Sequence, residues 1–87
     1  MLSNFTRNIH FTKLIKAAGY LREFNFRKLN TSPDPLFHVD VSDDRGNRIM
    51  FKMTRNQEGW QFVPQQLPPW VENAERDLSR TIDEELG

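Results

Sequence analysis

The sequence predicts an α+β fold: a two-layer sandwich in which an N-terminal and a C-terminal helix cover one face of a four-stranded antiparallel meander, in the order α-β-β-β-β-α. Four stretches between residues 20 and 63 alternate apolar and polar residues, as half-buried strands do. Short polar links join them, which favours antiparallel neighbours. An apolar stripe at helical spacing lies at each end of the chain, so two helices are available to cover one face of the sheet.

Residues 9–18 are predicted to form the N-terminal helix. The helical spacing i, i+3, i+4 and i+7 is met by Phe11, Leu14, Ile15 and Ala18. Gly19 suits the position just after a helix, where a left-handed backbone is common. The β-branched Ile9 and Thr12 favour a strand instead, so strand structure stays an open alternative for residues 5–18.

The four strands are predicted from residue 20 onward. Phe24 and Phe26 alternate with polar residues in the first, over residues 20–29, and a loop with two prolines follows at 30–35. Alternation resumes in three further strands at 37–42, 49–54 and 60–63. The links 43–47 and 56–59 contain Asp, Asn and Gly, which suit tight turns.

The final helix is predicted after the proline-rich segment 64–69, because proline is tolerated in the first helical turn. Every strand places its large apolar side chains on one parity, so only one face of the sheet needs covering. The expected core is Phe11, Leu14, Ile15, Phe24, Phe26, Phe37, Val39, Val41, Ile49, Phe51, Met53, Trp60, Phe62, Val71, Leu78 and Ile82. A single small domain over residues 1–87 follows from this one core.

The opposite parity leaves a polar sheet face that we take as the main candidate binding surface. Its candidate residues are Arg27, His38, Asp40, Arg48, Met50 and Lys52. The strand aromatics all fall on the other parity, whereas a reader of single-stranded RNA needs exposed rings on which bases stack. We therefore expect a non-catalytic interaction domain that binds an unidentified protein partner, with a homodimer as a further expectation.

Nucleic-acid binding is an alternative, because basic residues gather at the front of the chain. Residues 1–30 hold six basic residues against one acidic residue, whereas residues 64–87 hold two against six. The candidate phosphate-binding residues are Arg22, Arg27 and Lys28. The formal charge of the whole chain is zero, which weighs against this alternative.

An enzyme that uses a small ligand or a metal is the least favoured alternative. His38 and Asp40 lie two residues apart on one side of a strand, where they could act as an acid and a base. The chain has no Cys and no HExxH motif, so we expect no metal site and no cofactor.

A second candidate surface consists of Leu67, Pro69 and Trp70, before the final helix. Trp70 can either fasten the preceding loop to the core or remain exposed as an anchor for a partner. No stretch approaches the roughly 20 apolar residues that span a bilayer, and the N-terminus lacks the apolar run of a secretory signal. We therefore expect a cytoplasmic protein that does not bind membranes.

Overall fold

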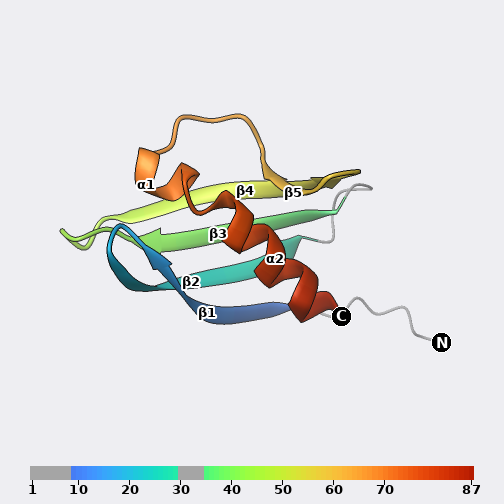
Figure 1. Cartoon of the computed structure of the whole chain (residues 1–87), viewed down its shortest axis with the longest axis horizontal. Coiled ribbons are helices and arrows are strands. Elements are labelled where there is room, and N and C mark those ends of the chain that lie inside the picture. Colours follow the sequence, from blue (N-terminus) through green and yellow to red (C-terminus); the bar gives the residue numbers. More distant parts are fainter. Residues whose placement is uncertain (1–8, 30–34) are drawn as a thin grey trace.

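The computed structural model describes residues 9–29 and 35–87, which form a five-stranded antiparallel sheet followed by two helices (Figure 1). The strands lie in the sheet in chain order: β1 (His10–Ala17), β2 (Tyr20–Leu29), β3 (Leu36–Ser42), β4 (Arg48–Asn56) and β5 (Gly59–Phe62). The helices are α1 (Pro69–Glu72) and α2 (Glu75–Leu86). The molecule is thus of α+β type, with its helices at the C-terminal end.

The predicted N-terminal helix is wrong, because residues 10–17 form β1. This strand pairs antiparallel with β2, from His10 opposite Arg27 to Ala17 opposite Tyr20, so the sheet has five strands rather than four. The pattern that suggested a helix also fits a strand, since the odd-numbered residues 11, 15 and 17 are apolar. Leu14, expected in the core, is 64 % exposed on the other face. Residues 5–8 lie outside the described residues.

The hairpin between β1 and β2 explains why Gly19 does not end a helix. Ala17 pairs with Tyr20, which leaves Ala18 and Gly19 as a two-residue turn. Their φ angles are 54° and 94°, so both central residues are left-handed. This is the backbone of the turns that best match the twist of a hairpin.

The four strands predicted after residue 20 are confirmed as β2 to β5, each antiparallel to the next. The register aligns Phe26 with Val39 and Val39 with Phe51, so the buried side chains of adjacent strands share one face. Most of the predicted loop, residues 30–34, lies outside the described residues.

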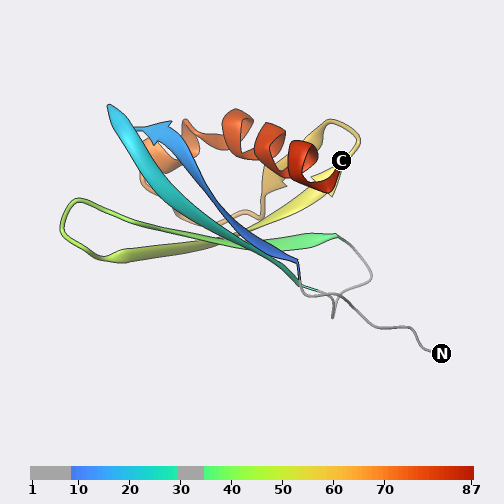
Figure 2. The ribbon, with the colours of Figure 1, turned by 90° about the horizontal axis from the view of Figure 1, so that it is seen from below.

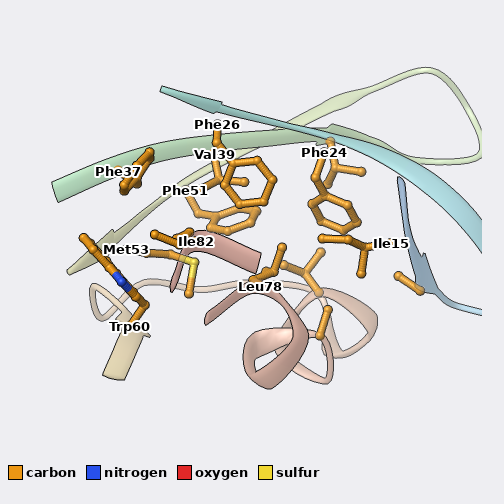
Figure 3. Packing of buried hydrophobic residues seen from close by; sticks show 14 residues of the cluster. Ile15, Phe24, Phe26, Phe37, Val39, Phe51, Met53, Trp60, Leu78 and Ile82 are labelled. Atoms are coloured by element: carbon orange, nitrogen blue, oxygen red, sulfur yellow. The ribbon is translucent and has the colours of Figure 1, made fainter. Parts of the chain in front are cut away.

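Both helices lie on the same side of the curled sheet (Figure 2). Leu78 and Ile82 of α2 point towards the apolar side chains of the strands (Figure 3). The fully enclosed cluster consists of Ile15, Ala17, Phe24, Phe26, Phe37, Val39, Val41, Phe51, Met53, Trp60, Val71, Ala74, Leu78 and Ile82. Phe11, Ile49 and Phe62 are partly buried against it, and Ala17 and Ala74 are core residues that the sequence analysis missed.

The predicted final helix divides into α1 and α2 at residues 73 and 74. Within residues 9–29 and 35–87, neither helix is long and apolar enough to cross a membrane.

Candidate binding face on the open side of the sheet

The side of the sheet opposite the helices carries the alternate, outward-facing residues of the strands, and we call it the open face. All six residues predicted for this surface lie on it. In the described chain the open face comprises His10, Thr12, Leu14, Lys16, Leu21, Glu23, Asn25, Arg27, Leu29, Leu36, His38, Asp40, Ser42, Arg48, Met50, Lys52, Thr54, Asn56 and Gln61. None of these residues is Phe, Tyr or Trp.

A ladder of hydrogen bonds crosses the middle of the open face. The Thr12 hydroxyl donates to Oδ1 of Asn25 at 2.7 Å, and Nδ2 of Asn25 donates to Oδ1 of Asp40 at 3.0 Å. Nε of Arg48 lies 3.5 Å from the same Asp40 oxygen. Thr12, Asn25 and Asp40 therefore hold one another in place across three strands. The Asp40 carboxylate already has two partners, Asn25 and Arg48.

A row of basic side chains runs beside this ladder. The register places His10 opposite Arg27, Arg27 opposite His38 and His38 opposite Lys52, on four adjacent strands. We call these four residues the basic row. Adjacent strands are about 4.8 Å apart, and Arg27 and Lys52 lie two strands apart, on either side of His38. Within the described residues, neither Arg27 nor Lys52 forms a salt bridge. The row therefore contains two cations without an acidic partner in the described chain.

The basic row and the ladder meet in a hollow of about 530 Å³ on the open face. Three members of the row line it together with the ladder residues, and Met50, which is 55 % exposed, adds an apolar side chain. The lining residues are His10, Phe11, Thr12, Asn25, Phe26, Arg27, His38, Asp40, Arg48 and Met50. The rings of Phe11 and Phe26 stack on each other and also line the hollow, so its lining combines polar and cationic groups with apolar ones.

His38 and Asp40 lie on the same face but do not act on each other. The cross-strand neighbours of His38 are Arg27 and Lys52, whereas the Asp40 carboxylate is bound by Asn25 and Arg48. The residues that the structure describes contain no group of three or more side chains able to hold a metal ion. The positions of His38 and Asp40 therefore give no support to acid–base catalysis by this pair.

No family model, curated protein or solved structure matches this chain. The predicted open face lacked His10 and Thr12 because both residues were assigned to a helix. The apolar residues at 11, 15 and 17 were the signal that could have placed both on the face of the sheet with Arg27 and Asp40.

The second predicted surface, around Trp70, is tied into the covered side of the molecule. The guanidinium carbon of Arg22 lies 4.4 Å from the centre of the Tyr20 ring and 4.5 Å from that of Trp70. Nη1 of Arg22 lies 2.9 Å from Asp44, to which the Tyr20 hydroxyl also donates at 2.6 Å. We call these four residues the Arg22 clasp. Leu67 and Trp70 pack against the core, while Pro69 is exposed.

The clasp also shifts the pKa values of Asp44 and Tyr20. The hydrogen bond from Tyr20, followed by that from Arg22, holds the pKa of Asp44 below its ordinary value. The Asp44 hydrogen bond in turn raises the pKa of Tyr20. Nε of Arg22 donates to the carbonyl of Ala17 at 2.8 Å, so the clasp ties the β1–β2 and β3–β4 turns to α1.

The structure does not bring together the three residues of the nucleic-acid alternative. Arg22 is in the clasp, where its side chain is only 9 % exposed. Lys28 shares the parity of the buried strand residues and pairs with Phe37, whereas Arg27 lies on the open face. The three cations therefore do not form one phosphate-binding surface.

Proposed function

We propose that this chain is a non-catalytic protein-binding domain that holds an acidic segment of a partner protein against the open face. The observation that carries the proposal is the basic row, in which four basic residues are cross-strand neighbours and no acidic residue separates them. Arg27 and Lys52 are the permanent cations of the row, and neither forms a salt bridge within the described residues. An anionic partner would supply the countercharge that these two side chains lack.

The distribution of charge also supports an acidic partner. On the open face, Asp40 is engaged by Arg48 and Asn25, which leaves Glu23 as the other carboxylate. Four Lys and Arg side chains share this face, although the chain as a whole has no net charge. Many of the compensating carboxylates belong to α2, on the other side of the sheet. An acidic partner is therefore attracted to one side of the molecule.

The chemistry of the face favours a protein over a single-stranded nucleic acid. Binding of single strands combines charge with aromatic rings on which bases stack, and the described part of the open face has no such ring. Met50 and Leu14, which are 55 % and 64 % exposed, instead offer apolar contacts to side chains of a partner.

The proposal is tested by NMR titration of the labelled protein with a capped peptide of alternating Glu and Thr. We expect chemical-shift changes at Arg27, His38 and Lys52. Binding should weaken as salt rises, because the Debye length falls from about 10 Å at 0.1 M to about 3 Å at 1 M. A single-stranded oligonucleotide of mixed sequence is titrated in parallel, and preferential binding of it at the same residues would overturn the proposal.

Charge reversal provides the matched control. The double variant Arg27→Glu with Lys52→Glu should weaken peptide binding about tenfold or more, because attraction becomes repulsion at two sites. Arg55→Glu with Arg76→Glu changes the net charge equally at exposed residues off the open face and should bind almost normally. Equal losses in both variants would mean that net charge, not the basic row, attracts the peptide.

A further inference from the structure

The two edges of the sheet differ in what covers them. At the β5 edge, the N–H of Trp60 donates to Oγ of Ser79 at 2.9 Å, and the N–H of Phe62 donates to Oε2 of Glu75 at 2.9 Å. Both acceptors belong to α2, which therefore takes the place of another strand. The fit is tight: a Cβ added at Gly59 would lie 3.0 Å from Oγ of Ser79.

The β1 edge has no such cover in the described part of the chain. The N–H of Lys28 donates to the carbonyl of Ile9 at 2.8 Å, and Ala17 and Tyr20 close the hairpin turn. Inward hydrogen bonds alternate along an antiparallel strand, so the odd-numbered residues of β1 bond to β2. The even-numbered residues 10, 12, 14 and 16 therefore direct their backbone N–H and C=O groups away from the sheet, and no hydrogen bond to these groups is found among the described residues.

The side chains of this edge are basic. Strand β1 contains His10, Lys13 and Lys16 and no acidic residue. Nζ of Lys13 lies 3.5 Å from Glu85 of α2, whereas Lys16 is exposed and forms no ion pair within the described residues. Lysines on an edge strand oppose pairing with a second copy of the same edge, because cations would face cations. An acidic strand beside β1 would instead place carboxylates opposite these cations.

Two exposed leucines lie between the two ends of the edge. Leu14 pairs with Glu23 and Lys16 pairs with Leu21, so Leu14 and Leu21 are diagonal neighbours on the open face. They are 64 % and 63 % exposed. A strand placed beside β1 would find Lys16, Leu14, Thr12 and His10 in turn along this face.

We propose that an acidic segment of a partner protein adds to β1 as a sixth, antiparallel strand. Its alternate residues would place an acid beside Lys16, an apolar residue beside Leu14 and a second acid beside His10, at the end of the basic row. Main-chain hydrogen bonds supply affinity in this mode, and alternate side chains supply specificity. The inference rests on the proposed function, since it names how the acidic partner is held.

The test uses a capped seven-residue peptide with Glu at its first and last positions, Leu at its third and Thr elsewhere. In the antiparallel alignment its first residue lies opposite Lys16 of β1 and its last opposite His10. N-methylation of the third and fifth residues removes donors aimed at Leu14 and Thr12, and should weaken binding tenfold or more. N-methylation of the second and fourth residues leaves the charge and the methyl count unchanged and should have little effect. Because only the peptide is altered, folding of the protein does not enter the comparison.

Hydrogen exchange provides the second readout. Peptide binding should protect the amides of Thr12, Leu14 and Lys16, which otherwise exchange freely. If both methylated peptides bind equally and these amides gain no protection, the proposal of a sixth strand is wrong. The proposed function would still stand in that case if the double variant Arg27→Glu with Lys52→Glu weakened peptide binding. If that double variant binds the peptide normally, the proposed function fails as well. Protection that rises with protein concentration alone would instead mean that β1 pairs with a second copy.

Discussion

The guanidinium carbon of Arg22 lies 4.5 Å from the centre of the Trp70 ring, so a strand near one end of the sheet is joined to the short helix that follows the last strand. The contact is of the cation–π type, which is strongest at Trp. It supports a fastening role for Trp70 within the fold, and it makes that role measurable.

Trp70→Ala should lower the free energy of unfolding by about 2–3 kcal/mol, somewhat less than for a fully buried Trp because the ring is half-buried. Trp70→Phe should retain most of the stability, because the aromatic face remains. Urea unfolding followed by circular dichroism measures both. An unfolding free energy within about 0.5 kcal/mol of the wild-type value, together with weakened peptide binding, would identify Trp70 as an anchor for a partner instead.

Asp44 should make the stability sensitive to acid. Its pKa is lowered in the folded protein, chiefly by the Tyr20 hydroxyl, so its contribution is present above the unfolded pKa and lost as pH falls through the folded value. The difference in melting temperature between the wild type and Asp44→Asn should therefore shrink as pH falls below about 4. A difference that stayed constant down to pH 2 would contradict this role of the carboxylate.

Tyr20 should make the stability sensitive to alkaline pH. Its pKa is raised, first by the hydrogen bond to Asp44, so its contribution is present below the unfolded pKa near 10 and lost as pH rises through the folded value. Tyr20→Phe should remove this alkaline dependence. Thermal melts of both proteins between pH 8 and pH 12 would check it, and parallel curves would show that the hydroxyl is not involved.

Asn25→Asp should weaken binding of the acidic peptide several-fold. The change keeps the shape of the side chain but places a second carboxylate beside Asp40, 3.0 Å from the present amide nitrogen. It also removes that hydrogen bond, which should cost about 1 kcal/mol of stability. Gln57→Glu adds the same charge in the exposed turn before β5 and is the control; both are measured by isothermal titration calorimetry. Equal effects of the two changes would argue against a role for the hollow.

Ala18→Asn should stabilise the fold by about 0.5–1 kcal/mol, because Asn tolerates the left-handed backbone that Ala18 adopts at φ 54°. Gly19→Ala should destabilise it by about 1 kcal/mol or more, since φ is 94° there. Urea titrations of the two variants measure the changes in unfolding free energy, which should have opposite signs. Destabilisation by Asn at position 18 would mean that the β1–β2 turn differs from the one described.

The strands β2 to β5 were predictable because their alternation is one-sided and their turns are short. Residues 9–18 were not, since Phe11 and Ile15 satisfy both a helical stripe and a strand face. What decides between them is the pairing of β1 with β2, a contact between chain segments that local spacing does not contain. Seven of the ten residues that line the hollow lie on the correctly predicted strands, whereas His10, Phe11 and Thr12 could join it only once β1 was known. The clasp depends on contacts between Arg22, Asp44 and Trp70, which no local pattern encodes.

The hydrogen bonds from Trp60 and Phe62 to the side chains of α2 have a consequence for assembly. A fibre grows by adding each new molecule to the end that the previous one left exposed, which requires two competent ends per molecule. Here the chain's own helix α2 occupies the outward N–H groups of Trp60 and Phe62. A molecule that has accepted a strand at β1 therefore offers no free donor at these two positions of β5, which opposes end-to-end polymerisation through that strand.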